Sequence, residues 1–225
     1  MKVELYDTTL RDGAQGEGIT FSPEDQLAVA QLLDRLGIHY IEGGQPASNP
    51  KAVNFFRQVK HLKLKRAKPV AFGGTCHPRR RPREDEALAK LLDAGTRHVA
   101  IVGKSWDFHV KKVLRISLKR NLKLIEETIR FLKSRGRDVF YDAEHFFDGF
   151  RENPGHALST LAAAAKGGAG RIILCDTNGG SMMDHLSEAV DAAKEAVETP
   201  LGIHTHNDSG LATANTLLAV EKGIT

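Results

Sequence analysis

The chain has 225 residues and a formal net charge of +4, from 32 Lys and Arg against 28 Asp and Glu side chains. Hydrophobic residues make up 41% and charged residues 27%, ordinary globular values that exclude a disordered or fibrous chain. The sequence has no run of about 18 apolar residues, so we expect no membrane contact, and its acidic start does not resemble a secretory signal peptide. With only two cysteines, Cys76 and Cys175, we expect a cytoplasmic protein.

Short runs rich in Val, Ile and Phe alternate with longer amphipathic stretches along the chain. We predict strands over residues 3–10, 40–43, 69–73, 99–103, 139–143, 171–175 and 201–206. We predict helices over residues 23–36, 50–62, 84–94, 118–135, 154–166, 182–198 and 210–222. The repeated alternation of strand and helix indicates a parallel sheet covered by helices.

The helix boundaries have clear residue signals. Ser22 is a typical N-cap and Pro23 suits the first helical position. The pairs Asn49-Pro50 and Asn153-Pro154 predict two further starts of the same kind. Helix ends are predicted at four glycines, namely Gly37, Gly95, Gly136 and Gly223.

The arrangement favours a TIM (β/α)8 barrel over an open sheet. A dinucleotide-binding open sheet requires a Gly-x-Gly-x-x-Gly motif after its first strand, and this sequence has none there. Polar residues occur at the C-terminal ends of nearly every predicted strand, where barrel enzymes place their active sites. We count about seven βα units where a complete barrel has eight, so we expect that the eighth unit is missing after Ile224-Thr225.

His204 and His206 end the seventh predicted strand. Side chains two apart on a strand share a face, so both rings point toward the barrel axis. Asp12 follows the first strand, which lies near the seventh in a barrel. These three residues predict a divalent-metal site for Mg, Mn, Co or Zn, with coordination positions left open for catalysis. The alternative for His204 and His206 is a hydrogen-bonded pair without a metal.

Other polar residues at strand ends are candidates for chemistry. Arg11 could stabilise charge that develops on a carbonyl oxygen, or form a surface ion pair. Glu144 could be an acid or base, or a structural hydrogen-bond acceptor. Thr177 could donate a hydrogen bond to a substrate carboxylate, and Glu42 is a weaker candidate of the same kind. Their convergence on one barrel mouth is the stronger argument.

Two motifs resemble the signatures of the DRE-TIM metallolyase superfamily. They are residues 7–15, from Asp7 through Arg11 and Asp12 to Gln15, and residues 204–208, from His204 to Asp208. The resemblance covers essentially the whole chain. Residues 13–18, 141–149 and 174–180 most resemble the (R)-citramalate synthases of that group.

The resemblance implies an acyltransferase that condenses acetyl-CoA with pyruvate and hydrolyses the thioester, in isoleucine biosynthesis. It implies metal ligands Asp12, His204 and His206, and catalytic residues Arg11, Glu144 and Thr177. It implies a substrate-binding set of Arg11, Gln15, Glu42, Tyr141 and Thr177. We expect residues 1–225 to form one catalytic domain without the family's linker and regulatory domain, and to work as a homodimer.

Two alternatives remain open at this point. A larger 2-oxo acid in place of pyruvate would make the chain a 2-isopropylmalate or homocitrate synthase. A non-catalytic module could instead use the basic loop 77–83 to bind RNA or an acidic protein, although a net charge of +4 gives no reason to expect nucleic acid.

Overall fold

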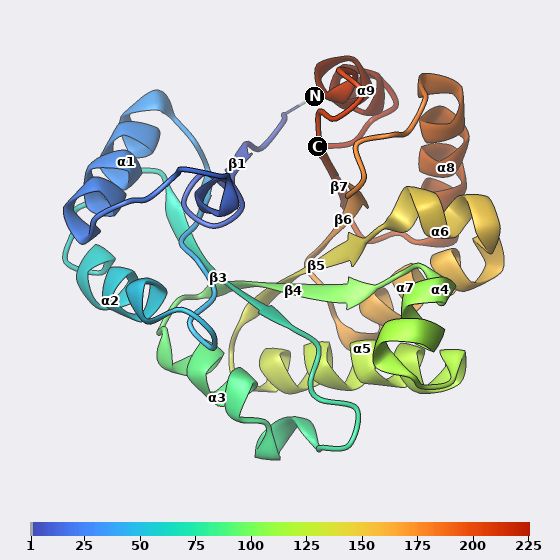
Figure 1. Cartoon of the computed structure of the whole chain (residues 1–225), viewed down its shortest axis with the longest axis horizontal. Helices are drawn as coiled ribbons and strands as arrows, with labels where there is room; N and C mark the ends of the chain where they lie inside the picture. Colours follow the sequence, from blue (N-terminus) through green and yellow to red (C-terminus); the bar gives the residue numbers. More distant parts are fainter. Residues whose placement is uncertain (1) are drawn as a thin grey trace.

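The computed structural model describes residues 2–225, which form a curved parallel sheet surrounded by helices (Figure 1). The strands are hydrogen-bonded in chain order from β1 to β7, and every neighbouring pair is parallel. They are β1 (Tyr6–Asp7), β2 (Tyr40–Glu42), β3 (Lys68–Gly74), β4 (His98–Lys104), β5 (Asp138–Glu144), β6 (Arg171–Asp176) and β7 (Leu201–Thr205). Within the described residues β1 and β7 do not pair. The fold is therefore an incomplete (β/α)8 barrel, as the sequence predicts.

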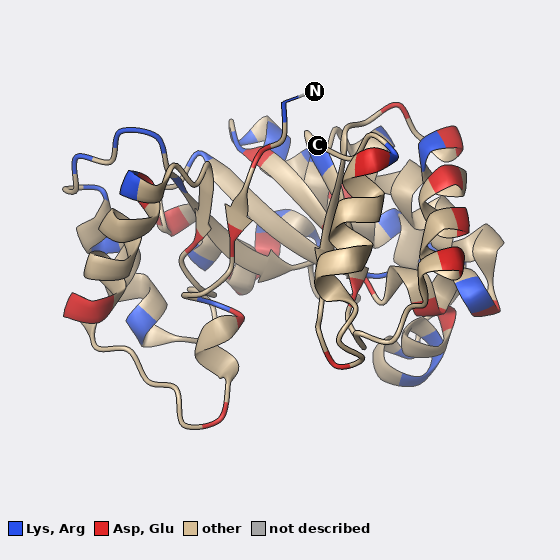
Figure 2. Ribbon diagram, turned by 90° about the horizontal axis from the view of Figure 1, so that it is seen from above, with Lys and Arg blue, Asp and Glu red and all other residues tan. Residues whose placement is uncertain are grey.

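Helices connect the strands and lie outside them, which Figure 2 shows from above. They are α1 (Pro23–Leu36), α2 (Pro50–Val59), α3 (Glu86–Asp93), α5 (Leu118–Ser134), α6 (Phe146–Glu152), α7 (Pro154–Gly167), α8 (Met183–Ala196) and α9 (Ala212–Glu221). Shorter helical turns are η1 (Gly13–Gln15), η2 (Pro82–Glu84), α4 (Asp107–His109) and the π-helical η3 (Val110–Leu114).

The predicted helix starts and ends are confirmed. Ser22 forms a capping box with Asp25 at the start of α1, and Asn49 and Asn153 cap α2 and α7 ahead of their prolines. Each of these caps supplies an acceptor for a backbone N–H that has no partner within the helix. The four predicted stop glycines, Gly37, Gly95, Gly136 and Gly223, all have positive φ angles.

Strand alternation produces two separate apolar cores. Inside the barrel, side chains from four strands form a small cluster, namely Tyr40, Val70, Phe72, Ala100 and Phe140. The intervening residues, such as Val99, Val139 and Tyr141, point outward into the larger core under the helices. Successive side chains face opposite sides of a strand. Whether a residue stands at an even or an odd position along its strand (its strand parity) therefore decides whether its side chain points into the barrel or toward the helices.

Two elements differ from the sequence prediction. The first strand is Tyr6–Asp7 rather than residues 3–10, because the chain turns at Thr8, whose carbonyl accepts hydrogen bonds from the next loop. Helix α6 was missed because it begins directly after β5, leaving no polar linker to mark it.

Arg171 on β6 connects the two ends of the chain. Its guanidinium forms an ion pair with Glu4 at 2.7 Å and also donates to the carbonyl of Thr225. The side chain is mostly buried, with 18% exposed. It therefore holds the segment before β1 close to the residues that follow α9.

The close packing of α2 on β2 leads to a stability prediction. A Cβ on Gly43 would lie 2.1 Å from Cε1 of Phe55, whereas one on Gly74, at the end of β3, meets nothing nearer than 4.0 Å. We expect Gly43→Ala to lower the free energy of unfolding by about 1–3 kcal/mol, because the buried Phe55 ring must move. Gly74→Ala is the matched control and should change it by less than about 0.5 kcal/mol. Equal urea midpoints for the two variants would contradict this packing.

Candidate functional site

The turn after β1 places Arg11 and Asp12 at the barrel mouth. Thr8 accepts backbone hydrogen bonds from Arg11, Asp12 and Gly13 at 2.8–3.1 Å. Asp7 fixes the same turn by accepting from the backbone N–H of Thr9 at 2.9 Å. These local bonds end the strand early and turn both functional side chains inward.

There Asp12 lies next to His204, on β7, and His206, the residue that follows β7. Asp12 Oδ2 lies 3.4 Å from His204 Nε2 and 3.5 Å from His206 Nε2, and the three donor atoms lie within 4.8 Å of one another. The imidazole rings are stacked with centroids 5.0 Å apart. Burial and the neighbouring His206 lower the pKa of His204 to about 4. His204 is thus neutral at pH 7, the form that binds a metal.

This donor set fits a divalent cation. One carboxylate and two imidazoles suit Mg²⁺ less well than Mn²⁺, Co²⁺ or Zn²⁺, and they leave positions for substrate. Among residues 2–225 this is the one group of three such side chains close enough to share an ion. The structure thus brings together the three residues that the spacing singled out.

Arg11 is held by two carboxylates and an aromatic ring. Its Nε donates to Glu42, its NH1 group lies 3.2 Å from Asp12 Oδ1, and its guanidinium carbon lies 4.1 Å above the Phe72 ring. The Glu42 side chain is fully buried and also accepts from the Tyr6 hydroxyl. Both of its oxygens hold Arg11 and Tyr6, and a contact between Glu42 and substrate stays a prediction.

Strand β5 contributes Asp142 and Glu144 to the barrel interior. Glu144 forms an ion pair with Lys104 from the end of β4. Asp142 is 7% exposed and lines a cavity of about 220 Å³ together with His204. Burial and the Glu42 carboxylate raise the pKa of Asp142 to about 8, so the group is largely protonated at pH 7.

Tyr141 lies on the other face of β5, so its predicted place in the substrate site is wrong. Its ring is fully buried under the helices, packed where a Cβ on Gly103 would lie, 2.6 Å from the ring. Its hydroxyl lies 3.5 Å from Ser105 Oγ. The cause is strand alternation, since Tyr141 lies between Phe140 and Asp142, which both face the barrel interior.

The remaining predicted residues lie near the mouth. Thr177 follows β6, and its hydroxyl oxygen accepts from the backbone N–H of His145 at 2.9 Å, which leaves its own proton free to donate. Gln15 is exposed at the end of η1 and lines a cavity of about 170 Å³ together with Arg11 and Gln45. A contact between Gln15 and substrate stays a prediction.

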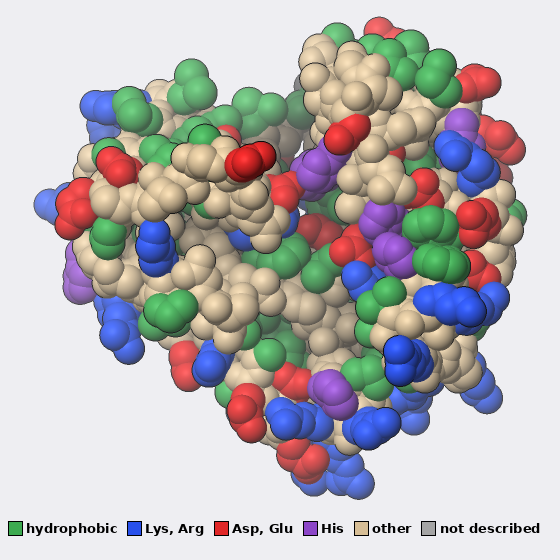
Figure 3. All heavy atoms as spheres, viewed as in Figure 1, with side chains coloured by type: hydrophobic (Ala, Val, Ile, Leu, Met, Phe, Trp, Pro, Cys, Tyr) green, Lys and Arg blue, Asp and Glu red, His purple; other side chains and the backbone are tan. Residues whose placement is uncertain are grey.

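Sequence reasoning missed four residues at this end of the barrel, namely Lys104, Asp142, His145 and Asp148. Lys104 and Asp142 occupy inward positions of β4 and β5. Asp142 could have been predicted, because it lies two residues before Glu144 and so shares its face of the strand. His145 pairs with Asp148 across one turn of α6, which was not predicted. Figure 3 views this end of the barrel and shows acidic and histidine side chains around a central hollow.

The basic loop 77–83 is fixed in place. The backbone N–H of His77 donates to Asp85 at 2.7 Å, and Arg120 donates to the carbonyl of Pro78 at 2.9 Å.

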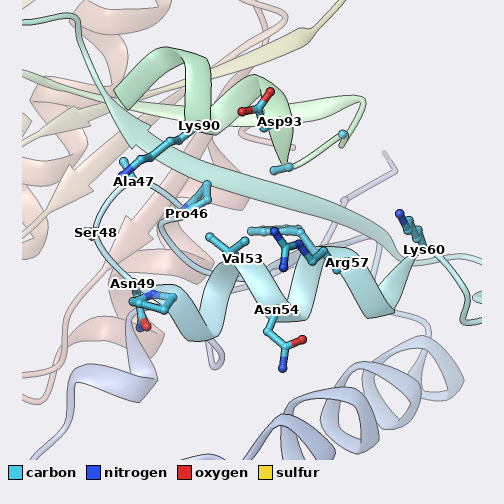
Figure 4. Close-up of a pocket in the computed structure, with 14 residues that line it drawn as sticks. Pro46, Ala47, Ser48, Asn49, Val53, Asn54, Arg57, Lys60, Lys90 and Asp93 are labelled. Atoms are coloured by element: carbon cyan, nitrogen blue, oxygen red, sulfur yellow. The ribbon is translucent and has the colours of Figure 1, made fainter. Parts of the chain in front are cut away.

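A larger groove, of about 720 Å³, lies outside the barrel between α2 and α3 and is lined by Val53, Arg57 and Lys90 (Figure 4). This groove contains none of the predicted site residues. The candidate site is therefore identified by its converging polar side chains and not by the size of its cavity.

Fold and site together define a barrel protein with an Asp-His-His constellation at its mouth. The HMGL-like family model matches residues 2–225, and the chain belongs to this family. This match confirms the resemblance drawn from residues 7–15 and 204–208. No helix in residues 2–225 is long and apolar enough to cross a membrane.

Curated relatives agree with this assignment. The chain is 52% identical to an (R)-citramalate synthase of Geobacter sulfurreducens and 51% identical to one of Synechocystis, over 99% and 98% of its length. It spans 42% of the length of each of these relatives. The solved HMG-CoA lyase of Bacillus subtilis shares the fold, with a TM-score of 0.82, 20% identity, and coverage of 100% of this chain and 75% of the other.

Metal binding by the three converging residues can be measured directly. We expect the purified chain to bind close to one equivalent of Mn²⁺ or Co²⁺ after dialysis against excess metal. The double variant His204→Ala, His206→Ala should retain less than about a tenth of that amount, because two of three protein ligands are gone. Emission spectroscopy gives the content, and His61→Gln, an exposed histidine after α2, is the control. Equal metal content in all three proteins would contradict the site.

The buried acid Asp142 predicts a pH dependence of stability. Between about pH 5 and pH 7 the unfolded chain has already lost this proton, because the ordinary Asp pKa is 3.8, while the folded chain keeps it, so Asp142 makes folding less favourable as the pH rises. We expect the stability of Asp142→Asn relative to wild type to increase by about 1–3 kcal/mol over that interval. Urea unfolding in chelator at both pH values tests this, with the exposed Asp184→Asn as control. A constant difference would show that Asp142 is ionised in the fold.

Proposed function

We propose that the chain carries out the condensation of acetyl-CoA with pyruvate to (R)-citramalate, a step of isoleucine biosynthesis. The observation that supports this most is the gradient of identity among relatives. Five (R)-citramalate synthases are 44–52% identical over nearly the whole chain. Homocitrate and 2-isopropylmalate synthases are 32–34% identical over the same residues.

Asp12, His204 and His206 would hold the divalent ion that this reaction needs. When bound, such an ion supplies Lewis-acid polarisation of a 2-oxo acid and a template for its orientation. The neutral state of His204 supports this assignment. Mn²⁺, Co²⁺, Zn²⁺ and Mg²⁺ remain the candidates.

Arg11 would stabilise the charge that grows on the keto oxygen during carbon–carbon bond formation. Its Nε is used by Glu42 and one NH1 donor faces Asp12, so the other N–H groups are free for substrate. Stacking on Phe72 and the buried ion pair fix the guanidinium before substrate arrives. A donor that is already in place loses little energy to reorganisation in the transition state.

Thr177 and Glu144 would complete the 2-oxo acid site. The free hydroxyl proton of Thr177 suits a substrate carboxylate, since its oxygen already accepts from His145. Glu144, held by Lys104, would orient substrate or move a proton at the reacting centre. The family resemblance further supports Gln15 as a substrate contact, and a cytoplasmic homodimer as the working form.

Substrate choice and the role of Arg11 are tested together. The metal-loaded protein should release free CoA thiol with pyruvate at least about tenfold faster than with 2-oxoglutarate or 2-oxoisovalerate, because a small pocket excludes larger substituents. Arg11→Gln should lose about 10²–10³ in kcat. Tyr141→Phe, which faces the helices, is the control and should stay within about twofold of wild type. A preference for a larger acid would replace this function by one of the related synthases.

A further inference from the structure

His145 occupies an unusual backbone conformation directly after β5. Its φ and ψ angles are 54° and 36°, in the left-handed region. Among the described residues, Arg115 is the one other non-glycine residue with a positive φ angle. Such strain persists only where the surroundings impose it, often at functional sites.

Side chains from α6 and from the loop after β6 impose this conformation. The Thr177 hydroxyl accepts from the backbone N–H of His145 at 2.9 Å. The Asp148 carboxylate lies 2.9 Å from His145 Nδ1, and Asn178 donates to the same oxygen at 3.0 Å. Although burial alone would raise the pKa of Asp148, the hydrogen bonds from His145 and Asn178 lower it. Asp148 is therefore a carboxylate that accepts Nδ1–H.

The His145 ring is also packed on two sides. Gly149 on α6 approaches the backbone of Ser105 and Trp106 so closely that a Cβ would lie 2.6 Å from the Ser105 carbonyl oxygen. This contact brings the Trp106 ring to 5.5 Å from the His145 ring, and His109 meets it edge-on at 4.6 Å. The imidazole therefore has one well-defined orientation.

His145 Nε2 is the unused atom of this arrangement. Within residues 2–225 it forms no hydrogen bond, and it is not among the buried polar atoms that lack a partner, so it is accessible to solvent. The side chain is 12% exposed. An imidazole whose Nδ1–H is held by a carboxylate and whose Nε2 is free has the arrangement of a general base.

The strand register places His145 beside the metal-ligand candidates. Cys175 pairs with His204 across β6 and β7, and Thr177 and His206 come two residues later, each directly after the end of its strand. His145 is bonded to Thr177, so the order along the mouth is His206, Thr177, His145. In the proposed condensation the thioester methyl carbon would bond to the keto carbon of a 2-oxo acid held at Asp12, and the thioester carbonyl is the next atom along from that methyl carbon. His145 directly follows Glu144, the last residue of β5, and so lies at this same end of the barrel.

We propose that His145 is the general base for thioester hydrolysis in the proposed condensation, and this inference rests on that function. Nε2 takes a proton from water while the water oxygen bonds to the thioester carbonyl carbon. The carbon–sulfur bond of the tetrahedral intermediate then breaks. The departing CoA sulfur takes the proton back from the imidazolium, which restores His145. Asp148 is a positioning residue that holds the ring through its contact with Nδ1.

The test separates hydrolysis from condensation. The metal-loaded chain is given either acetyl-CoA and pyruvate or the preformed CoA thioester of citramalate, and thiol and thioester are measured in quenched samples. In His145→Asn, which tolerates the left-handed backbone, hydrolysis of the preformed thioester should fall by about 10²-fold. Condensation should continue, so the thioester accumulates. Asp148→Asn should show the same accumulation with a smaller loss.

The controls distinguish the possible failures. His61→Gln makes a comparable change at an exposed site and should not accumulate thioester, and unchanged metal content verifies that each variant is folded. Hydrolysis at the wild-type rate in His145→Asn would overturn the inference, as would equal loss of both steps in His145→Asn and Asp148→Asn. A wild-type chain that hydrolyses the thioester but makes none from pyruvate would overturn the proposed function instead. A wild-type chain that does neither overturns both.

Discussion

The buried ion pair between Arg11 and Glu42 determines how this barrel mouth is built. A fully buried carboxylate is costly unless a cation or several donors compensate it, and Glu42 receives Arg11 and the Tyr6 hydroxyl. Arg11 is thereby fixed over Phe72 with a second contact to Asp12. The pair thus connects β1 with β2 and positions Asp12 toward β7. The proposed electrophilic role of Arg11 and the proposed ligand role of Asp12 depend on the same contact.

Strand parity explains which parts of the site were predictable. Because His204 and His206 are two residues apart, the sequence predicts that they share a face, and in the structure both Nε2 atoms lie within 3.5 Å of Asp12 Oδ2. The convergence of Asp12 on them followed from barrel topology, which brings the first and seventh strands to the same side. Glu144 was found in the same way, as a polar residue at a strand end. Tyr141 was misplaced because family resemblance marks a motif but does not say which of its residues face inward.

The residues that the sequence did not reveal depend on packing between elements. His145 and Asp148 become partners because α6 starts immediately after β5, and the left-handed turn at His145 has no local sequence signal. Lys104 gains a partner through the pairing of β4 with β5, since it lies opposite Glu144 in the register. The role of Glu42 in holding Arg11 follows from the complete burial of its side chain. That burial cannot be inferred from its position at the end of a predicted strand. In the fold, likewise, β1 is short because of bonds formed by the turn that follows it.

The electrostatics of the mouth give an independent argument for a cation. Three carboxyl groups, those of Asp12, Glu42 and Asp142, act on one guanidinium, that of Arg11. The fold reduces the resulting repulsion by keeping a proton on Asp142, whose pKa burial and Glu42 raise to about 8. A neutral His204 adds no positive charge, although its nitrogen lies 3.4 Å from Asp12. A divalent ion at Asp12 would supply the charge that the side chains lack, and would do so where two neutral imidazole nitrogens can bind it.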